Sequence, residues 1–139
     1  MTVASLACAP QHGAALTDDG RVLTWGAADG GRLGRRRKPG NADGLGGPPV
    51  SAQAHALPAA VPSLSDQGVV SLSAGGAHTV AATAKGELWL WGQVSLDKTY
   101  AVPVRAMGEH MGGAHFLRAW STEWSTFAVA IPPQTEEEY

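Results

Sequence analysis

Five histidines and one cysteine are the side chains with the clearest capacity for chemistry in this chain of 139 residues. His12 and His78 could act as a metal-binding pair or as acid–base groups, because imidazole titrates near neutral pH and ligates metals. The other histidines fall in expected loops, without metal-ligand spacing to one another or to the cysteine. They are His55, His110 and His115, and the cysteine is Cys8. We therefore expect no metal site and no cofactor.

Motifs that would carry a reaction are missing from the sequence. It contains no phosphate-binding loop with Gly-Lys-Ser/Thr, no Gly-x-Ser-x-Gly and no His-Glu-x-x-His. We therefore assign no catalytic residue and expect a protein that is not an enzyme.

One basic run stands out, formed by Arg35, Arg36, Arg37 and Lys38. It is interpreted either as a solvated loop, as a nuclear-import peptide, or as a contact for phosphate or for an acidic protein surface. We name these four residues as the candidate partner-binding site.

An internal repeat must position these side chains. Residues 3–26 and 69–92 align without a gap at nine identical positions of 24, a spacing of 66 residues. His12 and His78 occupy the same place in the two copies. A catalytic group rarely recurs in each repeat, so a structural histidine that bridges strands is the favoured interpretation. The predicted structural positions are His12, Gly20, Trp25 and Gly26 in the first copy and His78, Gly86, Trp91 and Gly92 in the second.

Each copy alternates apolar and polar residues with a period of two, which predicts short strands. Asp19-Gly20 and Lys85-Gly86 suit tight antiparallel turns. Further strands are expected at 57–62 and 101–106, so that each unit has the four antiparallel strands of a propeller blade. A weaker third copy spans 116–131, with Trp124 roughly where His78 stands. The predicted fold is an all-β, incomplete β-propeller of two to three antiparallel blades, with a long loop inserted after the first.

The segments divide accordingly. Residues 1–34 are the first repeat unit and 35–56 a flexible basic, Gly- and Pro-rich loop. Residues 57–131 hold the second repeat and the partial third, and 132–139 form an acidic disordered tail. Cys8 matches Ala74 within a strand pattern, so we expect it to be buried and inert. The tryptophans beside glycine are expected to fill space between blades, whereas Trp120 is a candidate for exposure.

The pattern Gly-x-x-His, a strand ending in Thr, a Gly turn and a strand ending in Trp-Gly resembles the regulator of chromosome condensation repeat. After Gly26 the first copy continues to Gly31, Leu33 and Gly34, which looks like the family's Gly-x-Leu-Gly; nothing similar follows Gly92. The resemblance covers about two and a half repeats. It implies a seven-bladed propeller, for which this chain supplies less than half a ring.

The favoured function is a non-catalytic protein–protein interaction or scaffold module, part of a larger assembly or a longer propeller. The alternative that the resemblance implies is guanine nucleotide exchange on a small GTPase. Open blade edges could also support self-association. The net charge of −2 argues against nucleic acid as a partner. No apolar run reaches the length of a membrane span, and a single cysteine without a signal sequence favours an intracellular place, cytoplasmic or nuclear.

Overall fold

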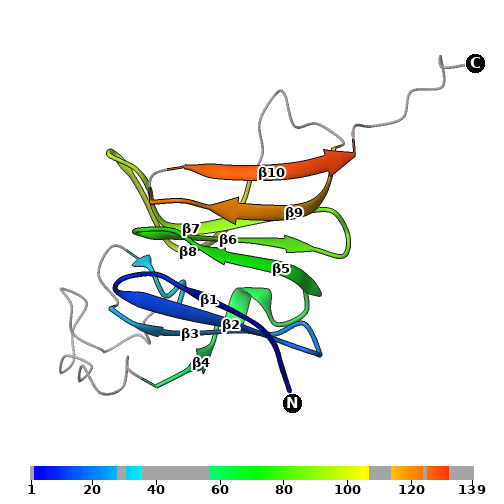
Figure 1. The fold of residues 1–139 in the computed structure, drawn as a ribbon, viewed down its shortest axis with the longest axis horizontal. Coiled ribbons are helices and arrows are strands. Elements are labelled where there is room, and N and C mark those ends of the chain that lie inside the picture. The colour runs from blue at the N-terminus through cyan, green and yellow to red at the C-terminus, as the bar shows by residue number, and fades with distance from the viewer. Residues whose placement is uncertain (1, 28–30, 36–56, 107–113, 124, 132–139) are drawn as a thin grey trace, which may run out of the picture.

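The computed structural model describes residues 2–27, 31–35, 57–106, 114–123 and 125–131, which form three antiparallel sheets. The sheets lie as successive layers, in chain order from one side of the molecule to the other (Figure 1). Most of the expected basic loop (36–56) and the whole of the expected acidic tail (132–139) lie outside the described residues.

The strands divide into two complete blades and a partial one. Blade 1 has the order β1 (Val3–Cys8), β2 (His12–Thr17), β3 (Val22–Gly26) and β4 (Ala59–Ala60). Blade 2 has the order β5 (Val69–Ala74), β6 (His78–Thr83), β7 (Leu88–Ser95) and β8 (Lys98–Arg105). Blade 3 pairs β9 (His115–Ser121) with β10 (Thr126–Ile131). The predicted all-β class and the partial propeller are confirmed.

Tight turns join the second and third strand of each complete blade. Gly20 and Gly86 adopt φ values of +82° and +84°, a left-handed conformation that costs glycine little. The hydroxyl of Thr17 donates to the Asp19 carboxylate, and the Arg21 guanidinium pairs with it at 2.9 Å. These two hydrogen bonds, with Thr17 contributing most, lower the pKa of Asp19 to about 2.

A bulge recurs in all three blades and fixes how they correspond. The register shifts between Val3 and Ser5, between Val69 and Ser71, and again on β9, where Phe116 and Arg118 face consecutive residues of β10. Blade 2 therefore corresponds to blade 3 with an offset of 47 residues.

This offset settles which residue of the third repeat corresponds to the repeated histidine. The backbone N–H of Gly75 donates to the His78 carbonyl, and the N–H of Thr122 donates likewise to Ser125. Ser125, not Trp124, thus occupies the histidine position. Trp124 itself lies outside the described residues.

The core lies between the blades. A cluster between blades 1 and 2 comprises Leu16, Val22, Val61, Leu64, Val69, Ala81 and Trp91. A smaller cluster between blades 2 and 3 comprises Val80, Leu88 and Ala119. All residues of β2 and of β6 are buried. Burying a large apolar side chain stabilises a fold by roughly 1.5–3 kcal/mol, so the inner sheet faces carry most of the stability.

The structure differs from the sequence expectations at three places. The strand expected at 101–106 lies within β8, which begins earlier, at Lys98. The strand expected at 57–62 is only two residues long, because Pro62 starts a 3-10 turn over Pro62–Leu64. The expectation that Cys8 is buried is wrong: it is exposed, because β1 is the edge strand of blade 1 and most of its residues face solvent.

Candidate functional site

The two repeated histidines each reach from one blade to the next. His12 Nε2 lies 2.9 Å from Thr79 Oγ1, and His78 Nε2 lies 3.0 Å from Thr126 Oγ1. Thr79 and Thr126 hold the same position in their blades. The series stops at the outer blades, since the corresponding residue of blade 1 is Gly13 and Ser125 replaces the histidine in blade 3. The predicted structural role of His12 and His78 stays a prediction, and this geometry supports it.

Burial keeps both imidazoles neutral. Desolvation, and secondarily the positive charge of Arg32 and the proximity of His78, lower the pKa of His12 to about 4. Burial also lowers the pKa of His78, partly offset by a hydrogen bond with the Ser125 backbone. A neutral imidazole that is 3–4% exposed and bonded to a threonine is poorly placed for acid–base work on a substrate.

Trp91 fills the space beside the His12–Thr79 pair. It lies opposite Thr79 across β6 and β7 and is fully buried. Its Nε1–H donates to the backbone carbonyl of Arg32 at 3.0 Å. A side chain at Gly34 would put its Cβ 2.8 Å from the indole ring. The segment after Gly26 therefore forms a socket for the tryptophan of the following blade.

The rest of that segment explains the Gly-x-Leu-Gly pattern. The hydroxyl of Thr24 donates to the Leu33 carbonyl at 2.7 Å, and Leu33 is buried. A Cβ on Gly31 would lie 2.6 Å from the Tyr100 carbonyl oxygen. Two glycines and one leucine thus let a loop of blade 1 pack closely on blade 2.

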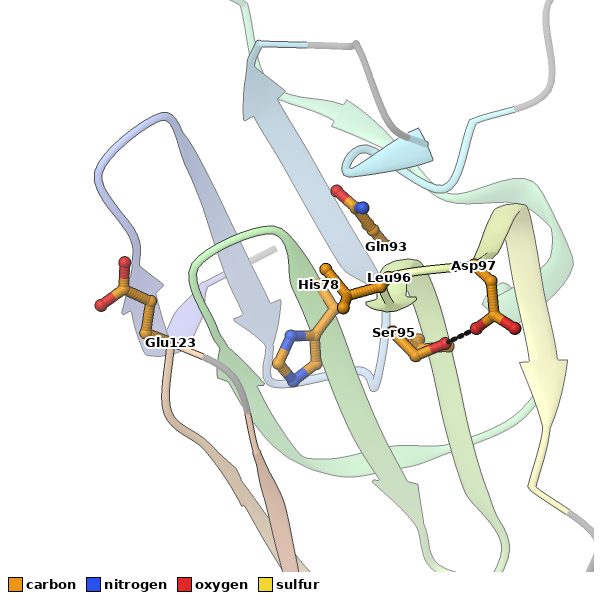
Figure 2. Close-up of a pocket in the computed structure, with 7 residues that line it drawn as sticks. His78, Gln93, Ser95, Leu96, Asp97 and Glu123 are labelled. Carbon is orange, nitrogen blue, oxygen red and sulfur yellow. Dashed lines mark hydrogen bonds between the residues drawn. The ribbon is translucent and has the colours of Figure 1, made fainter.

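At the corresponding place on blade 2 there is a hollow of about 410 Å³ instead of a filled socket. It is lined by His78, Gln93, Val94, Ser95, Leu96, Asp97 and Glu123. Figure 2 shows the His78 ring between the β7–β8 hairpin, with Leu96 and Asp97, and the β9–β10 turn, with Glu123. The Ser95 hydroxyl bonds the Asp97 carboxylate at 2.9 Å, and Leu96 is 90% exposed.

The strand β10 begins next to this hollow, because its first residue, Thr126, bonds His78, which lines the hollow. In blades 1 and 2 the corresponding strands β2 and β6 pair with β3 and β7. No strand pairs with the far edge of β10 in the described part of the chain, and all six residues of β10 are exposed. An unpaired edge presents backbone N–H and C=O groups to another strand.

Of the predicted basic site, the described residues include Arg35 alone; Arg36, Arg37 and Lys38 lie outside them. The Arg35 side-chain atoms Nε and Nη2 are buried, and no hydrogen-bond partner for them occurs within the described ranges. This desolvation lowers the pKa of the guanidinium. Arg35 directly follows Gly34, so the basic stretch starts at the Trp91 socket.

The remaining predicted positions lie at close approaches. A Cβ on Gly26 would be 2.6 Å from the Gln11 carbonyl oxygen, and one on Gly92 would be 2.4 Å from that of Ala77. Trp25 is half-buried and lies over Gly13, where a Cβ would meet its ring at 2.4 Å.

Sequence reasoning missed the hollow and its lining residues Gln93, Ser95, Asp97 and Glu123. One sequence feature could have indicated the hollow: the second copy lacks the Gly-x-Leu-Gly that follows Gly26 in the first. An exposed β-hairpin therefore stands where blade 1 has its socket.

Two other site types find no support within the described ranges. No group of three His, Cys, Asp or Glu side chains is arranged to hold a metal ion there. Nor does any helix in that part of the chain have the length and apolar character to cross a membrane.

The comparisons with known proteins agree with the repeat found in the sequence. The family model for the regulator of chromosome condensation (RCC1) repeat matches residues 19–82. The chain is 32% identical over 101 residues to the RCC1 domain-containing protein RUG3, mitochondrial, of Arabidopsis thaliana, covering 73% of this chain and 19% of that protein. It is also 32% identical over 157 aligned positions to the human E3 ubiquitin-protein ligase HERC2, covering 99% of this chain and 3% of HERC2.

A solved structure of Prp20p from Saccharomyces cerevisiae, described with its binding to Gsp1p and histones, superimposes with a TM-score of 0.71. The identity is 18%, and the match covers 99% of this chain and 32% of Prp20p. This likeness shows the fold. The chain spans less than a third of the length of each of these proteins.

Proposed function

Because this chain is built from regulator of chromosome condensation repeats, we propose that it is a non-catalytic protein-interaction module that binds an acidic protein surface. The basic stretch Arg35–Lys38 is the contact that we assign to this partner. The blades act as a rigid support, since loops carried on packed sheets are the usual place for binding residues.

The observation that carries the proposal is the state of Arg35. Two of its guanidinium nitrogens are withdrawn from water, yet no acceptor in the described part of the chain bonds them. A buried cation without a partner is costly, and a carboxylate matches the planar guanidinium with two parallel hydrogen bonds. An acidic side chain of a partner would therefore complete this site once the atoms that cover these nitrogens move aside.

An acidic protein surface fits the rest of the chain better than nucleic acid does. The net charge is −2, whereas proteins that bind the phosphate backbone carry a positive excess. A local basic stretch on a mildly acidic chain favours a small contact with carboxylates.

A fluorescein-labelled hexaglutamate peptide provides the probe, followed by anisotropy at low ionic strength. We expect Arg35→Gln to weaken binding at least tenfold, because a charge-assisted hydrogen bond contributes roughly 1.5–3 kcal/mol and about 1.4 kcal/mol is tenfold. Lys85→Gln is the matched control: it removes one positive charge from the exposed β6–β7 turn and should change binding less than twofold. Equal losses in the two variants, or no binding by the wild-type chain, would reject the proposal.

The second candidate is guanine nucleotide exchange on a small GTPase. What favours it is the shared fold with Prp20p, whose binding to Gsp1p has been studied. Release of a fluorescent guanine nucleotide from a panel of small GTPases tests this candidate. Acceleration by this chain would replace the scaffold proposal, and unchanged release would leave the scaffold as the function.

We place the module inside the cell, in the cytoplasm or nucleus. The plant relative carries a mitochondrial name, so fractionation should include mitochondria. Recovery in the mitochondrial fraction would overturn this placement.

A further inference from the structure

We propose that the open edge of β10 and the hollow beside His78 together bind an extended segment of another polypeptide, added as an antiparallel strand. Its sequence pattern is apolar-x-apolar-Trp-Gly, the pattern of residues 88–92 of β7; β3 shares the first apolar residue and the Trp-Gly but has Thr24 at the second apolar position. This inference rests on the proposed role as an interaction module and names the chemistry of one partner.

The two complete blades supply the template for the added strand. In blade 2, the β7 residues Trp91 and Gly92 lie opposite Thr79 and His78. In blade 1, Trp25 and Gly26 lie opposite Gly13 and His12 in the same register. With the offset of 47 residues, the added Trp lies opposite Thr126 and the added Gly opposite Ser125.

The backbone groups of β10 that meet the added strand follow from the same template. The N–H of Thr83 donates across to the Glu87 carbonyl, so it faces β7. Ala130 corresponds to Thr83, and groups that face one neighbour alternate along a strand. The N–H groups of Thr126, Ala128 and Ala130 therefore face the open edge, a row that main-chain hydrogen bonds can use.

The hollow receives the indole of the added tryptophan. Trp91 faces blade 1 on the same side as Thr79, next to His12, and ends in the socket at Gly34. A tryptophan opposite Thr126 faces blade 2 next to His78, which lines the hollow. Asp97 and Glu123 line this hollow, and a carboxylate turned toward the indole would accept its N–H, the part that the Arg32 carbonyl plays for Trp91.

The apolar residues of the pattern have partners as well. Phe127 and Val129 are 59% and 49% exposed. In the template register, the two apolar residues of the added strand lie opposite them, and cross-strand pairs of this kind stabilise a sheet. A second copy pairing through its own β10 offers no tryptophan for the hollow, so the Trp-Gly strand is the better fit.

The experiment uses a fluorescein-labelled peptide with the sequence of residues 86–95, GELWLWGQVS, titrated with the full chain. A second peptide exchanges the residues corresponding to Leu90 and Trp91, which keeps the composition but moves that indole to the opposite face. We expect saturable binding of the first peptide and at least about tenfold weaker binding of the second. Equal affinities, no binding up to about 1 mM, or a β10-paired dimer that excludes the peptide would overturn the inference.

A variant of the chain tests the edge itself. Ala128→Pro removes an N–H that faces the open edge, a place where proline is tolerated in a sheet. We expect at least tenfold weaker peptide binding, with Ala128→Ser unchanged; unchanged binding by the proline variant, at unchanged circular dichroism, would reject the edge. If the proline variant unfolds, the test rests on the affinities of the original and the exchanged peptide for the wild-type chain.

The two proposals fail separately. Arg35→Gln should leave the strand peptide bound, and Ala128→Pro should leave hexaglutamate bound. If the wild-type chain binds hexaglutamate but not the strand peptide, the strand site is rejected. If the wild-type chain binds neither probe, the interaction module is rejected as well.

Discussion

The interface between blades 1 and 2 and the interface between blades 2 and 3 use the same histidine–threonine pair but differ in what lies beside it. At the first interface, Trp91 is fully buried in the socket that ends at Gly34. At the second, His78 lines a hollow of about 410 Å³. The histidine–threonine contact between blades thus forms even where no tryptophan packs beside it. The strand that carries the tryptophan is therefore not needed for this contact.

The second interface uses other polar contacts. The N–H of Ser121 donates to Ser73 Oγ at 2.9 Å, and the N–H of Ala119 to Ser71 Oγ at 3.5 Å. The residue of blade 1 that corresponds to Ser73 is Ala7, so the first interface cannot make the shorter of these bonds. The first interface thus has the larger apolar cluster, whereas the second combines a smaller apolar cluster with hydroxyl contacts.

Removing the tryptophan should produce the largest effect. We expect Trp91→Ala to lower the free energy of unfolding by about 4 kcal/mol, because truncating a buried aromatic side chain leaves a cavity. Trp120, on the exposed side of blade 3, is 45% exposed, and its truncation should cost less than about 1 kcal/mol. Urea denaturation of the two variants measures the difference. Similar losses would show that the blade interfaces are not distinguished by aromatic filling.

The socket itself can be tested with two glycines of the same backbone conformation. Gly34 and Gly68 have φ values of +63° and +64°. A Cβ on Gly34 meets the Trp91 ring at 2.8 Å, whereas one on Gly68 has its nearest neighbour at 4.0 Å. We expect Gly34→Ala to cost about 3 kcal/mol and Gly68→Ala about 1 kcal/mol by denaturant unfolding, the excess being the clash. Equal losses of unfolding free energy in the two variants would mean that glycine is needed at position 34 only for its positive φ angle and not for contact with Trp91.

The neutral histidine makes stability depend on pH. The folded-state pKa of His12 is about 4, below its ordinary value of 6.5. Between these values the unfolded chain binds more protons, so stability is complete above pH 6.5 and is lost as the pH falls toward 4. The expected loss is on the order of 3 kcal/mol. Denaturant midpoints across this range should fall for the wild-type chain and fall less for His12→Gln; parallel slopes would contradict the assignment.

The smallest effect is expected at the second interface. Ser73→Ala removes the acceptor of the Ser121 N–H and should cost about 1 kcal/mol. Ala7→Ser places a hydroxyl at the corresponding position of blade 1, and its effect should stay within about 0.5 kcal/mol. Thermal unfolding of both variants checks this pair. If Ser73→Ala does not lower the stability of the chain, the hydroxyl contacts at the second interface do not stabilise the fold.

Local patterns predicted the blades well because strands and turns depend on nearby residues. The alternation and the turns at Gly20 and Gly86 lie within single copies, and the structure has strands and turns there. The aligned copies also put His12 and His78 at equivalent places. Cys8 was misjudged because alternation does not reveal whether a neighbouring sheet covers a face.

The candidate site was harder to foresee because it depends on contacts between distant segments. Trp91 bonds the Arg32 carbonyl 59 residues earlier in the chain. The hollow joins the β7–β8 hairpin to Glu123 on another blade. The one usable sign was that Gly-x-Leu-Gly follows Gly26 and not Gly92, and its meaning became clear only with the socket in view.

Amide hydrogen exchange tests the central claim most directly, with β6 and β10 as equivalent strands. The amides of Thr79, Ala81 and Thr83 should be protected, whereas those of Thr126, Ala128 and Ala130 should exchange fast in the free chain. Saturation with the peptide of residues 86–95 should slow these three at least tenfold, while protection of the β10 amides that face β9 stays high. Protection of the three without the peptide, or fast exchange in its presence, would contradict the account.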